Sequence, residues 1–125
     1  MTGPSKAPAG LAESIADYCL AKPGAWPDQP WEGDTVAKVG PKIFAFLGRE
    51  GGSLGLKCGR DRDAADELIA RYPGSVTAMA YIGRYGWNTV TLDGRIDVDD
   101  LLELIDASYD DVVARLPRKH RPVAG

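Results

Sequence analysis

The chain has 125 residues and a formal net charge of −3, with 44% hydrophobic and 26% charged residues. This size and composition predict one globular domain that buries a core without metal or disulfide support. They exclude a membrane span, which needs about 18 consecutive apolar residues, and a protein that grips nucleic acid through bulk positive charge. The N-terminus has no apolar signal segment, so we expect a cytoplasmic protein with one domain over residues 9–119 and flexible termini at 1–8 and 120–125.

The first element is expected to be a helix. Leu11, Ile15 and Cys19 recur at helical spacing, and the Pro-Gly pair at 23–24 ends the pattern. The following segment, KPGAWPDQPWEGD at 22–34, holds three prolines, two glycines and two tryptophans. It predicts an ordered loop whose tryptophans pack onto apolar surface.

Three strands are expected next. The runs TVAKVG and KIFAFLG flank a Gly-Pro turn at 40–41 and predict a hairpin. The run SLGLKCG alternates, which places Leu54, Leu56 and Cys58 inward and Lys57 outward.

The second half of the chain predicts two helices and two strands. Asp61 is a good N-cap for a helix that stops at the Pro-Gly pair at 73–74. The runs VTAMAYI and WNTVTL then predict two strands joined by GRYG. Asp97 caps a last long helix with an apolar stripe, which Pro117 closes.

The element order α-β-β-β-α-β-β-α predicts an α+β, two-layer fold. Runs of strands joined by hairpin turns favour an antiparallel sheet, here of five strands. We expect the first and last of the three helices to cover mainly one face of that sheet.

The segment YIGRYGW at 81–87 has two interpretations. In the first, Tyr81 and Trp87 pair across two strands and pack under a helix. In the second, Gly83 and Gly86 shape a tight tip that presents an arginine and a tyrosine to a partner, where they would bind phosphate and stack on a base. The residues alone leave both open.

Charge is unevenly distributed along the chain. Acidic residues crowd the last helix, so the remainder is basic, and a bipolar molecule would result if the basic residues share one face. An ordinary solvated surface is the alternative. Candidate contacts for a nucleic acid are Lys38, Lys42, Lys57, Arg60, Arg84 and Tyr85.

Catalytic, metal and cofactor signatures are missing from the sequence. The single histidine, His120, lies in the basic tail, and Cys19 and Cys58 are too far apart in sequence to form a metal-binding pair. No nucleophile series or phosphate-binding loop is present. We therefore expect a protein that is not an enzyme and holds no metal or cofactor.

Four segments of the chain resemble the MmcQ/YjbR family of small bacterial proteins. They are QPWEGDTVAKVGPKIFAFLG, SLGLKCGRDR, YIGRYGWNTVTLDG and LIDASYDDVVARLPRK, in matching order. The resemblance implies a YjbR-like α+β fold, comparable to secretion chaperones, with a double-wing DNA-binding motif. The chain departs from the common family pattern by having Tyr81 and Gly86 where histidines are usual.

The resemblance and the segregated charge together predict a non-enzymatic DNA-binding module that uses its hairpin tips and basic face. The alternative is a small-molecule- or peptide-binding protein of chaperone-like architecture. Its pocket or groove would be lined by Trp26, Trp31, Tyr81 and Trp87.

Overall fold

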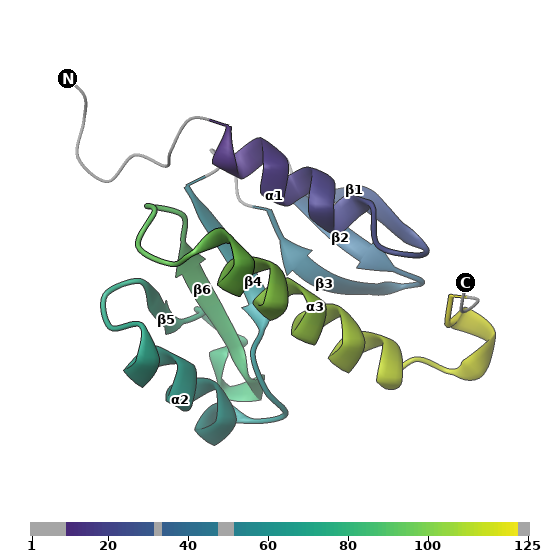
Figure 1. The fold of residues 1–125 in the computed structure, drawn as a ribbon. Helices are drawn as coiled ribbons and strands as arrows, with labels where there is room; N and C mark the ends of the chain where they lie inside the picture. Colours follow the sequence, from purple (N-terminus) through teal and green to yellow (C-terminus); the bar gives the residue numbers. More distant parts are fainter. Residues whose placement is uncertain (1–9, 32–33, 48–51, 123–125) are drawn as a thin grey trace.

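The computed structural model describes residues 10–31, 34–47 and 52–122, which form an antiparallel sheet with α-helices against it (Figure 1). In chain order the elements are α1 (Leu11–Leu20), β1 (Ala25–Trp31), β2 (Asp34–Val39), β3 (Lys42–Phe46), β4 (Ser53–Lys57), α2 (Arg62–Arg71), β5 (Val76–Ala78), the short 3-10 helix η1 (Gly83–Tyr85), β6 (Trp87–Thr91), α3 (Val98–Ala114) and the 3-10 helix η2 (Arg118–His120). No helix in this part of the chain has the length and apolar character needed to cross a bilayer.

The sheet has six strands in the order β1-β2-β3-β4-β6-β5, and not the five that the sequence predicts. The additional strand is β1, which lies in the segment predicted to be a loop. It pairs with β2 from Ala25 opposite Val39 to Asp28 opposite Val36, and its register then shifts. An edge strand needs backbone donors on one side only, so Pro27 is compatible with pairing there. The observed order is α-β-β-β-β-α-β-β-α, apart from the 3-10 helices.

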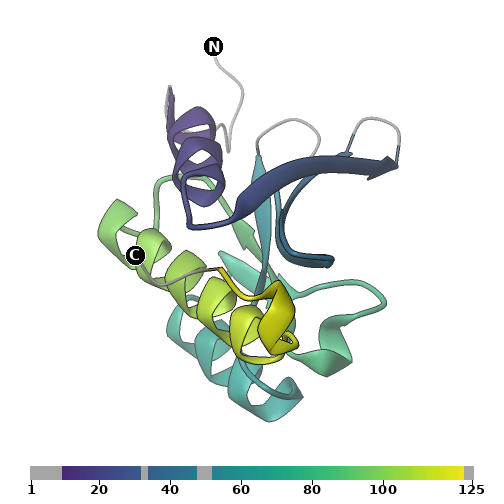
Figure 2. The same ribbon diagram turned by 90° about the vertical axis from the view of Figure 1, so that its right-hand side faces the viewer.

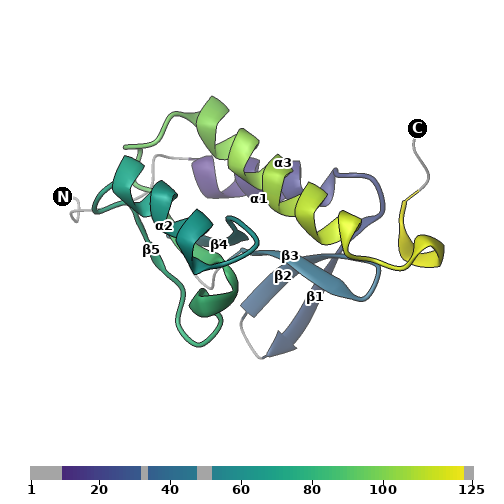
Figure 3. The ribbon, with the colours of Figure 1, turned by 90° about the horizontal axis from the view of Figure 1, so that it is seen from below.

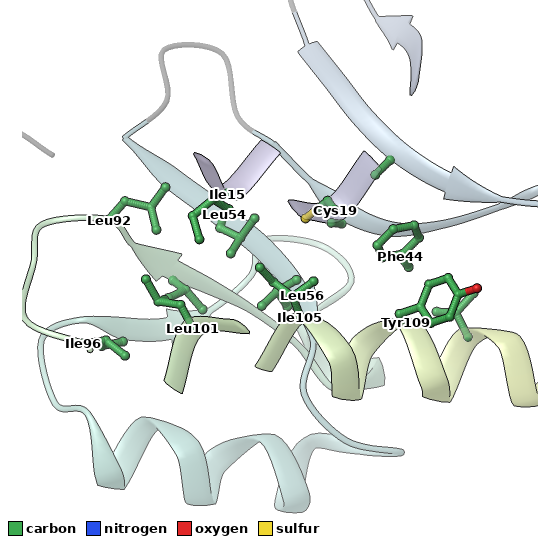
Figure 4. Packing of buried hydrophobic residues seen from close by; sticks show 14 of the residues in the cluster. Ile15, Cys19, Phe44, Leu54, Leu56, Leu92, Ile96, Leu101, Ile105 and Tyr109 are labelled. Atoms are coloured by element: carbon green, nitrogen blue, oxygen red, sulfur yellow. The ribbon is translucent and has the colours of Figure 1, made fainter. Parts of the chain in front are cut away.

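The α-helices lie on one side of the curved sheet, as expected, and the opposite side carries no α-helix among the described residues (Figure 2). The main core lies between α3 and strands β3 and β4. Leu54 and Leu56 of β4 face Leu101 and Ile105 of α3 (Figure 4), and all four are almost fully buried. Alternation along β4 and the apolar stripe of α3 therefore predict the core correctly.

Of the two predicted helix N-caps, one makes the expected capping hydrogen bond. The Asp61 carboxylate accepts a hydrogen bond from the backbone N–H of Ala64 at 3.0 Å and caps α2, as predicted. Asp97 occupies the N-cap position of α3, but its side chain makes no capping bond. Beyond α3, Arg121 donates to the carbonyl oxygens of Leu116 and Ala114, at 2.9 and 3.0 Å. These bonds satisfy carbonyl groups that the helix end leaves free.

Part of the C-terminal segment packs against the domain. Residues 120–122, part of the terminus expected to be flexible, lie against two turns of the domain. A Cβ atom on Gly24 would lie 3.1 Å from the Pro122 ring, and one on Gly40 would lie 3.2 Å from the His120 carbonyl oxygen. Residues 1–9 and 123–125 lie outside the described part of the chain.

A polar contact joins α1 to α3 at the edge of the core. The Tyr18 hydroxyl donates to the Asp106 carboxylate at 2.7 Å, and the Lys22 ammonium group forms an ion pair with the same carboxylate. Burial by itself raises the pKa of Asp106, but the hydrogen bonds from Lys22 and Tyr18 outweigh it and hold that pKa below its ordinary value. The ionised carboxylate is therefore the form that stabilises this contact.

This shift predicts a pH-dependent contribution to stability. A carboxyl group whose pKa is lowered in the folded state stabilises the protein above its unfolded pKa of about 3.9, and the contribution disappears as the pH falls through the folded value. Because Asp106 is partly exposed, Asp106→Asn should cost at most about 1 kcal/mol at pH 7. Thermal melts at pH 7 and pH 3 should show this difference shrinking in acid, with Asp110→Asn as the control. A difference that is equally large at pH 3 would contradict the assignment.

Candidate ligand-binding cleft

Strands β3 and β4 separate after only two paired positions, Ala45 opposite Leu56 and Phe46 opposite Gly55. At the next position the Ser108 hydroxyl of α3 stands between the strands. It accepts a hydrogen bond from the Lys57 N–H at 2.9 Å and donates one to the Phe44 carbonyl oxygen at 2.6 Å. A side-chain hydroxyl thus takes the place of a ladder hydrogen bond, and the two strands diverge beyond it.

The diverging strands open a cleft of about 310 Å³, which we call the cationic cleft. The C-terminal half of α3 runs beside β3 along this side of the molecule (Figure 3). Three cations, one tryptophan and two aliphatic side chains line the cleft: Lys42, Ile43, Lys57, Trp87, Val112 and Arg115. Four elements contribute to it, so the lining is assembled by the fold and not by one segment of sequence.

Lys57 lines the cleft but is largely buried and does not lie on the solvated surface, which corrects the outward position predicted from alternation. The residue is only 8% exposed. Its ammonium group donates to the carbonyl oxygens of Gly59 at 2.9 Å and Tyr85 at 2.6 Å, and lies 3.8 Å from the Asp111 carboxylate. Burial lowers the pKa of Lys57, while the nearby Asp111 acts in the opposite direction. Lys57 therefore supplies fixed positive charge from within the structure.

The other two cations are available at the mouth of the cleft. Arg115 uses its Nε to donate to Asp111 at 3.0 Å, and its side chain is 53% exposed. Its two terminal nitrogens have no hydrogen-bond partner among the described residues. Lys42 is exposed and has no ion-pair partner within the same residues. In this part of the chain Asp111 is the one carboxylate that forms an ion pair with any of these cations, and it contacts Lys57 and Arg115. Asp61 adds a weaker attraction to Lys57, so the three cations retain a net positive charge.

Trp87 gives the cleft an apolar wall. It lies opposite Lys57 in the pairing of β4 with β6. Its ring meets Phe46 edge to face, with centroids 5.4 Å apart and an interplanar angle of 77°. This packing leaves the half-buried indole in one orientation beside the cations.

The loop before β6 has a different conformation from the one predicted. Tyr81 does not lie in a strand or pair with Trp87: β5 ends at Ala78, and Tyr81 has a φ of +67° and is 96% exposed. The Ile82 N–H donates to the Ala80 carbonyl oxygen at 2.7 Å, which closes a three-residue turn around Tyr81. The interpretation in which this whole segment packs into the core is therefore wrong for Tyr81.

The tip of the same loop presents the two residues proposed for a surface role. Arg84 and Tyr85 lie in η1, and both are exposed. The Arg84 guanidinium stacks 4.9 Å from the centre of the Tyr85 ring. Since the Tyr85 carbonyl oxygen holds the Lys57 ammonium group, η1 borders the cationic cleft.

A partly buried network that the sequence analysis missed fixes this loop. Arg62 donates to the carbonyl oxygens of Gly83 at 2.7 Å and Trp87 at 3.3 Å, and to the Asn88 side chain at 2.6 Å. Asn88 in turn donates to the Ala65 carbonyl oxygen at 3.0 Å. One signal was present in the sequence, because Asn88 is a polar residue at an inward position of an alternating strand.

Lys38 and Trp26 are not among the residues that line the cleft, although Lys38 pairs with the lining residue Ile43. Lys38 forms an ion pair with Asp28 at 2.7 Å and lies 5.2 Å from the centre of the Trp26 ring. Trp26 donates its indole N–H to the Gly40 carbonyl oxygen at 3.0 Å. Trp31 ends β1, and the position of its side chain lies outside the described part of the structure. Of the four residues suggested for an aromatic pocket, Trp87 is the one that lines the cationic cleft.

Comparisons with known proteins agree with the resemblance seen in the sequence. The model of the YjbR family matches residues 20–111. The uncharacterized protein YjbR of Escherichia coli strain K12 is 30% identical over 110 residues, which are 86% of this chain and 91% of that protein. The crystal structure of Deinococcus radiodurans protein DR2400, a DUF419 domain, superposes with a TM-score of 0.76 at 23% identity and covers 96% of this chain and 88% of that chain. A Pseudomonas syringae protein superposes with a TM-score of 0.60 at 21% identity and covers 77% and 93%. The chain belongs to the YjbR family.

Proposed function

We propose that this chain is a non-enzymatic binding protein that holds nucleic acid, DNA in the first instance, at the cationic cleft. The observation that carries the proposal is the convergence of Lys42, Lys57 and Arg115 beside the Trp87 ring. Cationic side chains neutralise phosphate groups, and aromatic rings accept bases by stacking. A local excess of positive charge provides this chemistry in a chain whose net charge is −3.

Residues next to the cleft extend the proposed surface. The two carbonyl groups that hold Lys57 belong to Gly59 and Tyr85. Gly59 is followed by the exposed Arg60, and Tyr85 is preceded by Arg84. Arg60, Arg84 and Tyr85 are therefore tied to the cleft through the backbone. Lys38 contributes less to the proposed surface, because Asp28 neutralises it.

The proposal of a binding role without catalysis is supported by the state of the one thiol near the cleft. Burial raises the pKa of Cys58 to about 11, so the thiol is protonated at neutral pH. A small-molecule ligand is the second candidate. The cleft volume of about 310 Å³ lies at the lower end of the range of small-ligand sites.

DNA binding at the cleft can be tested by fluorescence anisotropy with labelled single- and double-stranded oligonucleotides over a range of salt concentrations. The apparent log K should fall by about 0.9 per neutralised phosphate. Lys42→Ala and Arg115→Ala should each weaken binding about tenfold and reduce the salt slope by about one.

Arg95→Ala provides a matched control for loss of an exposed arginine. Arg95 precedes α3, whereas Arg115 is its C-cap, and the 17 residues of the helix place the two ends about 25 Å apart. Binding and salt slope should be unchanged in this variant. If wild-type protein binds neither form of DNA at low salt, or if all three variants behave alike, the proposal fails.

A further inference from the structure

The charge of the cationic cleft matches a doubly charged anion better than a singly charged one. Lys42, Lys57 and Arg115 provide three positive charges, of which Asp111 offsets one, and Asp61 acts more weakly on Lys57, so a net positive charge remains. A phosphodiester inside a nucleic-acid strand carries one negative charge. A phosphate monoester carries close to two at pH 7, because its second pKa is about 6, and it has three acceptor oxygens.

The shape of the cleft favours the end of a molecule over a continuous strand. Its inner end is closed where Ser108 bridges the Phe44 carbonyl group and the Lys57 N–H, and where β3 and β4 resume pairing at Ala45 and Leu56. A nucleic-acid strand that passed through the cleft would have to enter and leave between β3 and β4. A terminal phosphate needs only to enter.

Lys57 and Arg115 differ in how many of their hydrogen-bond donors are available to a phosphate group. Lys57 already donates to two carbonyl oxygens, so it acts on a ligand in the cleft mainly through its charge. Arg115 keeps its two terminal nitrogens free of partners within the described residues, and a guanidinium group in this state can bind phosphate through two parallel bonds. Lys42 adds an exposed cation, while Trp87 and Val112 offer apolar surface to the sugar and base.

We propose that the cationic cleft recognises a terminal phosphate monoester on a nucleotide unit. This inference rests on the proposed function, because the ligand class is a nucleic-acid strand end or a nucleotide. The two sources share the same chemistry at the cleft, and the experiment separates them.

The test compares oligonucleotides of one sequence that carry a 5′-phosphate, a 3′-phosphate or only hydroxyl ends, by fluorescence anisotropy with wild-type protein. A terminal phosphate should tighten binding by about tenfold or more at pH 7.5, through charge-assisted bonds to Arg115 and Lys42. The preference should decrease below about pH 6, where the monoester takes up a proton. Adenosine 5′-monophosphate and adenosine are tested in parallel by NMR, with the Trp87 indole and the Lys57 amide as reporters.

Three variants locate the effect. Lys42→Ala and Arg115→Ala should reduce the preference for phosphorylated ends towards unity. Arg84→Ala, in the loop beside the cleft, should weaken binding of all strands alike and keep the preference. Arg95→Ala should change neither quantity.

Each outcome decides between the proposals. Preference for phosphorylated strands supports the inference with a strand end as the source. Binding of the mononucleotide at Trp87 and Lys57 without strand binding supports it with a free nucleotide as the source, and overturns the DNA proposal. Equal binding of phosphorylated and hydroxyl-ended strands overturns the inference and leaves the DNA proposal standing. Binding of neither strands nor mononucleotide overturns both.

Discussion

Gly86→Ala should destabilise the fold by about 3 kcal/mol or more, the largest effect that we expect from adding a single methyl group. Gly86 has a φ of +95°, a conformation that costs a side-chain-bearing residue about 1–2 kcal/mol. A Cβ atom there would also collide with the carbonyl oxygen of Gly59 and lie 3.2 Å from that of Asp61. Overpacking against backbone of this kind typically costs a further 1–3 kcal/mol. Urea unfolding of the two proteins measures the difference.

Gly10→Ala separates the two contributions. Gly10 has a similar φ of +79°, but a Cβ atom there would have nothing within 4 Å. This variant should therefore lose only about 1 kcal/mol, the cost of the backbone conformation. Equal losses in Gly10→Ala and Gly86→Ala would show that the approach of the Gly59 backbone is unimportant.

The same geometry favours a glycine at position 86, where the resemblance to the family implies a histidine. The Gly86 carbonyl oxygen accepts the Cys58 N–H at 2.7 Å, so the loop lies directly on the backbone that carries Lys57. An imidazole at this position would need a different loop conformation. Gly86 therefore allows the loop conformation in which the Tyr85 carbonyl oxygen binds the Lys57 ammonium group and η1 borders the cationic cleft.

Ser108→Ala should cost about 2–4 kcal/mol and abolish binding at the cleft. Removing the hydroxyl leaves the Lys57 N–H and the Phe44 carbonyl group without a partner in a buried site, and each such loss costs about 1–3 kcal/mol. The strands can recover a bond only by approaching one another, which would narrow the cleft. Urea unfolding and the anisotropy assay, performed on the same samples, measure the two effects.

A variant of comparable stability shows whether binding is lost through the cleft or through general destabilisation. Leu102 lies in the first half of α3, packs against the core and does not line the cleft. Leu102→Ala should lower stability by about 2 kcal/mol or more and retain ligand binding. Should Ser108→Ala bind as well as Leu102→Ala, the hydroxyl would have no role in shaping the site.

The helices and most of the core could be predicted from the sequence, because their signals are local. The stripe of α3 and the cap at Asp61 depend on residues three or four positions apart. β1 could not be predicted in this way. Its prolines are incompatible with a central strand. The segment forms a strand because it pairs with β2 on one side only, at the edge of the sheet.

The candidate site was predicted in part for a related reason. Lys42, Lys57 and Trp87 were recognised as candidates, and the structure brings them to one cleft. Alternation predicts the face of β4 on which the Lys57 side chain lies. It does not predict that a later loop buries the ammonium group by means of the Tyr85 carbonyl oxygen. Ser108 escaped notice because its two partners lie 51 and 64 residues away, a distance at which no local pattern reports contact.

The prolines of β1 also bear on how copies of this chain can meet. β1 is one edge of the sheet, and Pro27 and Pro30 carry no backbone N–H to offer a strand added beyond it. The opposite edge, β5, is only three residues long. Exposed edges usually invite strand-to-strand aggregation, and natural proteins block them with prolines and short strands. Oligomers of this protein should therefore form through its faces or helices and not by continuing the sheet.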